Sequence, residues 1–205
     1  MPERYPKREE AIAMLEKAAE INPGTWTDHS RNVAEMAETI ASHCAMDSEK
    51  AYVLGLLHDI GRSEYRGWNQ MHHVIYGYTM LKDSYPEAAR ICMTHSYVTR
   101  DIREYGDQNN LMCSEEEQQF IQNYIDGIEY DDYDLLIQLC DSMCLPDGVT
   151  TIEKRLVDVG RRYGTNDLDR DRWNGVFAIK DHFDSMCKTN IYLYFREEIE
   201  RSIFG

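Results

Sequence analysis

Apolar residues recur at helical spacing along almost the whole chain, and this periodicity restricts the fold more than any other feature of the sequence. We expect a first helix at about Lys7–Glu20, and no stretch shows the two-residue alternation of a half-buried strand. Further helices are expected from near Asp28, at about Glu49–Ile60, Gln70–Lys82 and Pro86–Ser96, from Ser114, at Asp131–Cys144 and Thr150–Tyr163, and at about Asp167–Lys188 and Asn190–Phe204. The pattern therefore predicts an all-α fold, with residues 1–205 forming a single compact multi-helix domain.

Turn and capping residues predict where several of these helices begin and end. The sequence Asn-Pro-Gly at 22–24 should stop the first helix, and Gly61 is expected as the C-cap of the third. Residues Ser114–Glu117 have the pattern of a capping box. Thr150 together with Glu153 is expected to cap the helix that follows the Pro-Asp-Gly turn at 146–148. These stops divide one periodic pattern into separate helices that can pack against one another.

The chain carries a strong excess of acidic residues. Its 205 residues include 37 Asp and Glu against 22 Lys and Arg, which gives a formal net charge of -15 at pH 7. A surface of this sign repels phosphate backbones and anionic lipid headgroups, so we expect no nucleic-acid partner and no membrane partner. The longest apolar run, at 51–57, is far shorter than a bilayer span, and the N-terminal segment lacks the apolar region of a signal peptide. A cytoplasmic location is therefore expected.

Six cysteines are present, and none belongs to a Cys-x-x-Cys pair. They are Cys44, Cys92, Cys113, Cys140, Cys144 and Cys187. They are scattered through the apolar faces of expected helices, which is typical of reduced cysteines that pack as small core residues. Cys140 and Cys144 are four residues apart and could share one helix face, where core packing is the favoured interpretation.

Four of the seven histidines lie on the apolar faces of four different expected helices. They are His29, His58, His73 and His95. A buried imidazole costs free energy unless its nitrogens find partners, and a shared metal ion would satisfy several of them at once. Two carboxylates join them, because Asp59 follows His58 in GLLHDIGR and Asp141 follows the apolar segment LLIQLC. Imidazole and carboxylate together suit Fe, Mn, Zn, Ni or Co better than Ca.

At these positions the chain resembles the HD superfamily of metal-dependent phosphohydrolases. The doublet His58–Asp59 stands in the HDIG form of the family signature, within LLHDIGR. The other motif residues are His29 in WTDHSRNVAEMAETIA, His73 in HHVIYGYTML with Gly77 four residues later, His95 in ARICMTHS, and Asp141 in LLIQLCDSM. This ordered set covers about residues 25–145, and residues 146–205 are expected to form helices packed beside that core.

The resemblance implies a site for one or two divalent transition-metal ions. Fe, Mn, Ni, Co and Zn are the expected metals, with Mg as a further option. The implied ligands of the first ion are His29, His58, Asp59 and Asp141. Asp59 would bridge to a second ion that His73 and His95 also hold. Relatives with a second histidine directly after the position of His95 bind two ions readily, and Ser96 occupies that place here, which weakens the second site.

In such a site a metal-activated water attacks phosphorus. The candidate catalytic residues are Asp59, His73, His95 and Arg62. Arg62, which follows the HDIG sequence, and Arg100, in the irregular stretch after His95, are the candidate substrate-binding residues. For both arginines a solvated surface position is the alternative. His72 is expected to point about 100° away from His73, outside the ligand shell, where it could still donate a proton.

The resemblance also implies the reaction, which is hydrolysis of a phosphate ester or anhydride of a small molecule. A nucleotide or a dinucleoside polyphosphate is the expected substrate, and the lack of a GYP motif speaks against the cyclic-di-GMP branch. Two alternatives stay open, a di-iron oxygenase on the same superfold and a metal-stabilised binding module without enzymatic activity. A homodimer also stays open, because the aromatic run at 191–195 could form a dimer contact, although closing the core is favoured.

Overall fold

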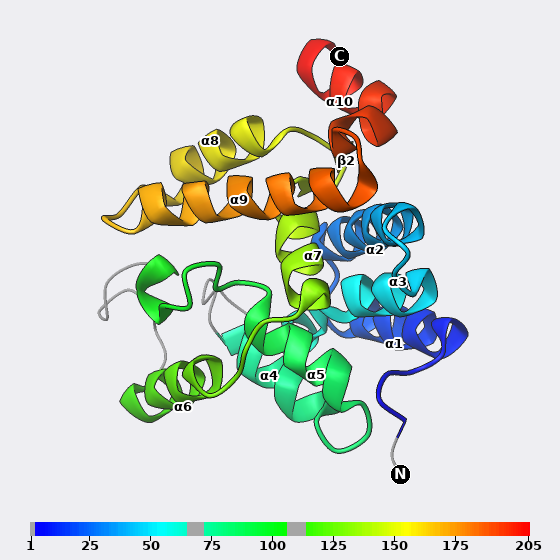
Figure 1. The fold of residues 1–205 in the computed structure, drawn as a ribbon. Coiled ribbons are helices and arrows are strands. Elements are labelled where there is room, and N and C mark those ends of the chain that lie inside the picture. The colour runs from blue at the N-terminus through cyan, green and yellow to red at the C-terminus, as the bar shows by residue number, and fades with distance from the viewer. Residues whose placement is uncertain (1–2, 65–71, 106–113) are drawn as a thin grey trace.

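The computed structural model describes residues 3–64, 72–105 and 114–205 of the chain (Figure 1). Within these ranges the α-helices are α1 (Arg8–Ile21), α2 (Trp26–His43), α3 (Ser48–Leu57), α4 (His72–Leu81), α5 (Pro86–Thr94), α6 (Glu115–Asp126), α7 (Asp132–Asp141), α8 (Ile152–Tyr163), α9 (Asp169–Cys187) and α10 (Arg196–Phe204). Three short 3-10 helices accompany them, η1 (Ile60–Glu64), η2 (Ile102–Tyr105) and η3 (Ile191–Phe195). The all-α prediction is confirmed, and the expected start of the fourth helix at Gln70 lies outside the described residues.

A small hairpin departs from the all-helical expectation. Strands β1 (Cys144–Leu145) and β2 (Gly148–Val149) pair antiparallel. The helix that was expected to reach Cys144 ends at Asp141 instead. The chain then reverses through the turn at 146–148, where Gly148 has a φ of 135° that side chains disfavour. As a result, Asp141 lies at an open helix end rather than inside a continuous helix.

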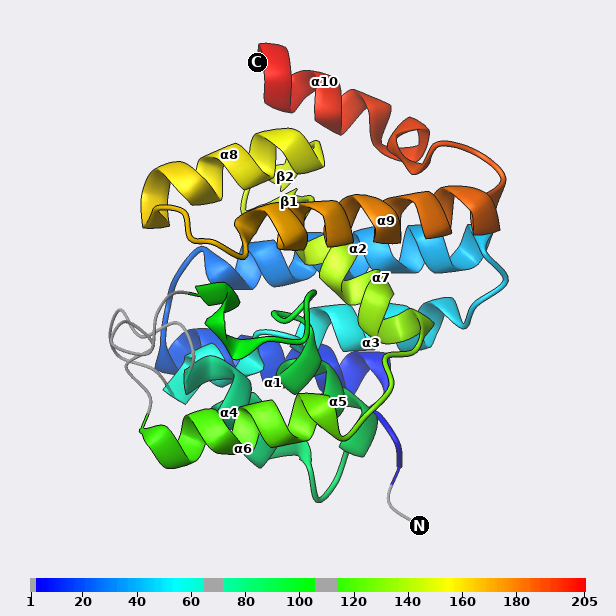
Figure 2. The same ribbon diagram turned by 60° about the vertical axis from the view of Figure 1, so that its left-hand side comes forward.

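Helix α7 runs through the middle of the molecule (Figures 1 and 2). On one side of it, α2 and α3 pack against each other and α1 packs on α3, while α4 and α5 form a second pair with α6 outside α5. On the other side, α9 crosses α7 and the neighbouring part of α2, and α8 lies against α9. This arrangement brings the ends of α3, α5 and α7 towards one interior region.

Gly61 has a different role from the one expected. Helix α3 ends at Leu57 with His58 at its C-cap position, so the prediction of Gly61 as the C-cap is wrong. Gly61 lies in η1, which packs on α4, and a Cβ there would stand 2.0 Å from the carbonyl oxygen of His73. The same Cβ would stand 2.4 Å from the backbone nitrogen of Gly77. Only glycine permits this approach, which sets η1 directly against the helix that carries His73.

The capping predictions are confirmed at one position and corrected at another. Ser114 and Glu117 form a complete capping box at the start of α6. The N-cap of α8 is Thr151, whose side chain accepts from the backbone of Lys154, and not Thr150. Thr150 is fully buried and its hydroxyl forms a 2.9 Å hydrogen bond with Ser202 of α10. The cap therefore lies one residue later than expected, and Thr150, directly after β2, makes a buried contact with α10 instead of capping α8.

The C-terminal helices share their buried residues with the core formed by α2 and α3. Val176, Ile179 and Phe183 of α9 belong to the same apolar cluster as Ile40 of α2. In the run at 191–195 the two end residues, Ile191 and Phe195, are also buried in this cluster. The run therefore contributes to the core. None of the helices described by the structure combines the length and apolar content needed to cross a bilayer.

The expectation that all cysteines are reduced is wrong for one pair. Cys44, directly after α2, and Cys187, the last residue of α9, form a disulfide with their Cα atoms 4.9 Å apart. The pair joins two helix ends that are 143 residues apart in sequence, a distance over which spacing carries no signal. Cys92, Cys140 and Cys144 are free and buried, as expected. Cys140 and Cys144 do not share a helix, because the second lies in β1, and Cys113 lies outside the described residues.

Candidate metal centre

Six polar residues predicted from the sequence come together from five separate places in the chain. Each lies at or near the end of a helix, where the backbone leaves polar groups without helical partners. They are His29 near the start of α2, His58 and Asp59 just after α3, His73 at the start of α4, His95 just after α5, and Asp141 at the end of α7. All except Asp141, which is partly exposed, are buried. The fold thus gathers the predicted cluster in one interior region.

Asp59 lies at the centre of one half of this cluster. Its Oδ1 atom is 3.2 Å from Nε2 of His73 and 3.6 Å from Nε2 of His95. Its Oδ2 atom is 3.7 Å from Nε2 of His58. The Nε2 atoms of His73 and His95 are themselves 3.2 Å apart. Both carboxylate oxygens of one residue therefore face imidazole nitrogens from different helices.

His58 connects this half of the cluster to the other. Its ring centroid is 4.9 Å from that of His95 and 5.4 Å from that of His29. His29 in turn contacts Asp141, with Nε2 and Oδ1 2.9 Å apart. The six residues therefore form one continuous group.

The donor atoms have the spacing and the chemistry that a transition-metal ion requires. In three overlapping groups the potential ligand atoms lie within 4.8 Å of one another: His29, His58 and Asp59; His58, His95 and Asp141; and Asp59, His73 and His95. Nε2 of His58 and Oδ1 of Asp59 are buried without a hydrogen-bond partner among the described residues. Buried polar atoms are rarely left in this state, so their arrangement fits a divalent ion with nitrogen and oxygen ligands.

Backbone carbonyls fix the orientation of two of the imidazoles. Nδ1 of His58 lies 2.6 Å from the carbonyl oxygen of Gly55, and Nδ1 of His95 lies 3.1 Å from that of Ile91. A carbonyl only accepts, so in each ring the proton must be on Nδ1 and the lone pair on Nε2. The lone pairs consequently point into the cluster, as they do in histidines that bind metals.

The charge states of the cluster favour cation binding. Burial lowers the pKa of His58 to about 4, so its ring is neutral at pH 7. Burial would raise the pKa of Asp59, but Arg62, His58 and His73 outweigh it and hold the pKa well below its ordinary value. Burial would likewise raise the pKa of Asp141, and the hydrogen bond from His29 outweighs it. Ionised carboxylates and neutral imidazoles are the forms that bind metal ions.

Arg62 lies directly against the cluster. Its Nε atom donates to Oδ2 of Asp59 at 2.5 Å, and its side chain is about one-third exposed. The backbone carbonyl of Arg62 accepts a 2.7 Å hydrogen bond from the side chain of Asn22. Asn22, which in the sequence was only part of a turn signal, therefore holds the segment that carries this arginine.

One predicted site residue, Arg100, is not brought into the cluster, and His72 lies outside it as expected. Arg100 directs its guanidinium to the carbonyl oxygens of Ile125, at 2.7 Å, and Ile128, at the end of α6. In this structure it therefore stabilises a helix end, and the prediction that it binds substrate gains no support from its position. His72 contacts α6 instead, with Nε2 3.5 Å from a carboxylate oxygen of Glu117.

The fold and the site together define an all-helical protein with a buried His/Asp cluster suited to a divalent metal. Residues 26–144, more than half of the chain, match the model of the HD domain, and the chain belongs to this family. The predicted resemblance, placed at about 25–145, is thereby confirmed, and all six cluster residues lie within the matched range. No solved structure matches the chain.

The carbonyls that orient the imidazoles were missed in the sequence, although a signal for them existed. Gly55 precedes His58 by three residues and Ile91 precedes His95 by four. In a helix this spacing places a carbonyl one turn behind the side chain. A histidine at the end of an apolar helix can therefore be expected to donate backwards along its own helix.

Proposed function

We propose that this protein is a metal-dependent phosphohydrolase that acts on a phosphate ester or anhydride of a small molecule. The observation that carries the proposal is the position of Asp59, whose two buried oxygens face His58 on one side and His73 and His95 on the other. A carboxylate in this position can contact two ions at once. Membership of the HD domain family supports the same class of chemistry.

The proposed ligands divide into two sets that share Asp59. One set is His29, His58, Asp59 and Asp141, and the other is Asp59, His73 and His95. Divalent ions in such sites lower the pKa of bound water and neutralise charge on phosphoryl oxygens. Because Nδ1 of His58 and Nδ1 of His95 are engaged with carbonyls, these rings act as ligands through Nε2 and do not serve as proton shuttles.

Arg62 has two roles in this proposal. Its guanidinium keeps Asp59 ionised, as their 2.5 Å contact indicates. It also lies at the partly exposed edge of the cluster, where a guanidinium group can contact a phosphoryl oxygen. The net charge of -15 does not oppose this binding, because the local charge of the loaded site decides it. With two divalent ions, Asp59, Asp141 and Arg62 together leave the site positive.

The proposal also includes the class of substrate, the identity of the metal and the location of the protein in the cell. We favour a nucleotide or a dinucleoside polyphosphate as substrate, on the family resemblance, and Fe, Mn, Ni, Co or Zn as the metal. The disulfide between Cys44 and Cys187 provides a test of the expected cytoplasmic location. In the cytosol Cys44 and Cys187 would be held as thiols, whereas an oxidising compartment would preserve the bond.

Metal analysis and a phosphate-release screen test the proposal. The purified protein should contain a divalent transition metal, and with added Mn²⁺ or Co²⁺ it should release phosphate from at least one nucleotide, dinucleoside polyphosphate or sugar phosphate. Asp59→Asn should abolish both metal retention and phosphate release. His182→Gln is the matched control, because His182 is exposed and pairs with Asp132 away from the cluster.

Several outcomes would contradict the proposal. If the protein binds no metal, or if Asp59→Asn releases phosphate at the wild-type rate, the assignment of the cluster is wrong. If the protein binds iron, releases no phosphate and consumes O₂ with an organic substrate, the oxygenase alternative replaces the hydrolase.

A further inference from the structure

Helix α7 presents three polar side chains on one face, and two of them have no place in the proposed chemistry. Asp134, Gln138 and Asp141 are spaced four and three residues apart, which puts them on the same side of the helix. Asp134 and Gln138 are almost completely buried. Such residues at core positions require partners, and both find theirs on α5, the helix that leads to His95.

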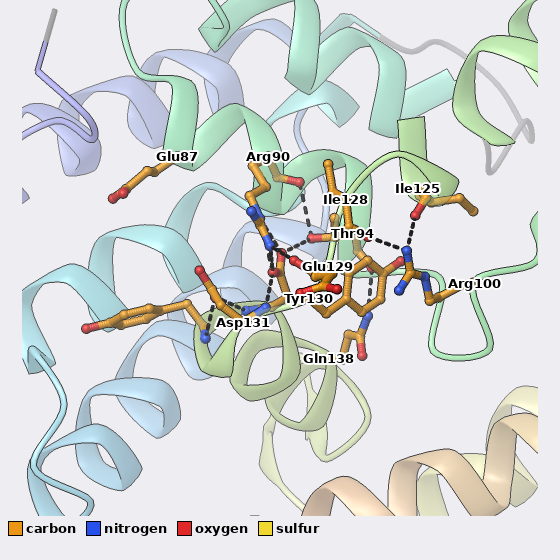
Figure 3. Close-up of polar contacts among 12 residues, drawn as sticks. Glu87, Arg90, Thr94, Arg100, Ile125, Ile128, Glu129, Tyr130, Asp131 and Gln138 are labelled. Atoms are coloured by element: carbon orange, nitrogen blue, oxygen red, sulfur yellow. Dashed lines mark hydrogen bonds and ion pairs between the residues drawn. The ribbon is translucent and has the colours of Figure 1, made fainter. Parts of the chain in front are cut away.

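Gln138 contacts the backbone of Thr94 (Figure 3) and that of Tyr97, on either side of His95 in the sequence. Its side-chain nitrogen Nε2 lies 2.9 Å from the carbonyl oxygen of Thr94 and 3.4 Å from that of Tyr97. Both partners are carbonyls, so the orientation of the amide is determined and its NH₂ group faces α5. One side chain thereby forms hydrogen bonds with both ends of the short segment in which His95 lies.

A second contact, one helical turn earlier on α7, strengthens the same junction. The hydroxyl of Thr94 donates to Oδ1 of Asp134 at 2.7 Å, and Arg90 forms an ion pair with Asp134 and also donates to the carbonyl of Glu129 (Figure 3). Asp134 in addition caps the start of α7 by accepting from the backbone of Asp131. The end of α5 is therefore held by α7 at two levels.

A buried glutamine is a costly way to fill this space. Its Oε1 atom finds no donor among the described residues, and an apolar side chain of similar length would avoid that cost. What the amide adds is a directed link between helices, because its N–H groups connect α7 to the carbonyls of Thr94 and Tyr97, the second of which also accepts from the hydroxyl of Tyr130. Gln138 thus contributes to the position of α5 relative to α7 rather than to the burial of apolar surface.

We propose that Gln138 is a positioning residue that holds His95 in register with Asp141, so that ligands from α5 and α7 meet at one metal centre. The inference rests on the proposed function, since it assigns Gln138 to the assembly of that same site. Gln138 stands one turn before Asp141 on α7 and grips the backbone on either side of His95. A shift of α7 along α5 would separate His95 from Asp141, and the hydrogen bonds of Gln138 oppose that shift.

The test compares Gln138→Met with Thr150→Val in the full-length protein. Gln138→Met keeps the length of the side chain and removes both donors. Thr150→Val removes the hydrogen bond between the buried Thr150 and Ser202 of α10, which involves no residue of the cluster, and leaves the backbone hydrogen bond of Thr150 to Met143 in place. Co²⁺ affinity is measured by competition with a chelator, and the visible absorption of bound Co²⁺ reports the ligand geometry. Urea unfolding of each variant shows how far a general loss of stability contributes.

Gln138→Met should weaken Co²⁺ binding about 10- to 100-fold, as the loss of outer contacts to metal ligands does, and should change the Co²⁺ spectrum. Thr150→Val should lower stability but leave affinity and spectrum at wild-type values. Gln138→Glu is a second variant, for the case that Gln138→Met fails to fold. Its carboxyl group donates a hydrogen bond to one of the two carbonyls when it is protonated and to neither when it is ionised. Its Co²⁺ affinity should therefore recover as the pH is lowered within the range where wild-type affinity is still constant.

Unchanged affinity and spectrum in both Gln138 variants would overturn the inference. If the wild-type protein binds no Co²⁺ at all, the proposed function fails, and the register is then read from amide hydrogen exchange of the metal-free protein. The amides of His95 and Tyr97, which bond to Ile91 and Thr94, should exchange faster in Gln138→Met and not in Thr150→Val. Equal exchange in all three proteins would refute the positioning role independently of the metal.

Discussion

The disulfide between Cys44 and Cys187 leads to a prediction whose magnitude can be worked from the structure. It joins the end of α2 to the end of α9 across a sequence separation of 143 residues. Closing a loop of this length removes unfolded-chain entropy worth about 5 kcal/mol at 25 °C, and removal of native disulfides costs about 2–5 kcal/mol. The double substitution Cys44→Ser with Cys187→Ser should therefore lower the free energy of unfolding by about 2–5 kcal/mol.

The measurement is urea unfolding followed by far-UV circular dichroism, with and without dithiothreitol. The reductant provides a matched control within the experiment, because it should lower the stability of the wild-type protein towards that of the double variant. It should leave the double variant unchanged. The chain has three further described cysteines, all buried and free, and these do not respond to a reductant.

Two results would refute the reasoning, and each identifies a different fault. If both Cys44 and Cys187 react with an alkylating agent in unfolded, unreduced protein, the disulfide does not form in solution. If the disulfide is present by mass spectrometry but its removal leaves the free energy of unfolding unchanged, then loop closure does not stabilise this fold. In that second case the ends of α2 and α9 would already be held together in the unfolded ensemble.

The remaining predictions concern the cluster and its supports. Gly61→Ala should cost about 1–3 kcal/mol in urea unfolding and weaken metal binding, because its Cβ would stand 2.0 Å from the α4 backbone; Gly160→Ala, whose Cβ meets nothing closer than 3.5 Å, should be neutral or stabilising. Burial lowers the pKa of His58 from 6.5 to about 4, so the unfolded chain takes up a proton before the folded protein does. The metal-free protein, kept in chelator, should therefore hold its full stability above pH 6.5 and lose about 3 kcal/mol as the pH falls to 4, and His58→Gln should flatten this dependence. Arg62→Ala should raise the pKa of Asp59 and slow phosphate release about 10- to 100-fold, and a wild-type rate would remove Arg62 from the site. Arg100→Ala should lower stability by about 1 kcal/mol through the end of α6 and leave the rate unchanged, whereas a rise in KM would restore Arg100 as a substrate contact.

Most of the fold could be predicted because its elements depend on local patterns. Helix positions follow from apolar spacing, and most of the described helices fall where that spacing placed them, within a few residues at the ends. The helix expected at Asn190–Phe204 is the exception, because its first part is the 3-10 helix η3 and α10 begins only at Arg196. The capping box at Ser114 is equally local and was predicted in full. The end of α7 was misplaced because the hairpin after Asp141 depends on pairing between β1 and β2, which apolar spacing does not report.

The cluster could be predicted for a related reason. Polar residues such as His58 and Asp59 at the end of an apolar run are unusual at buried positions, and this mismatch with their neighbours indicates a functional site. The supporting contacts could not be predicted in this way. Gln138 is also a polar residue in an apolar run, LLIQLC, but its partner Thr94 lies 44 residues away in the sequence, so its contact could not be inferred. Arg100 also binds carbonyls distant in sequence, and nothing in its own neighbourhood distinguishes it from other polar residues. The disulfide fails the same way, because its two halves meet only in the folded chain.

The order in which the chain is made gives a further consequence of where these contacts lie. During synthesis, helices near the N-terminus emerge first and can fold while the rest is still being added. His29 must wait for Asp141, 112 residues later, before the two can meet. Cys44 waits longer still, because Cys187 follows after α7 and α8 have been made. All six cluster residues are therefore made before Cys187, so the cross-link between α2 and α9 is the last of these contacts that can close.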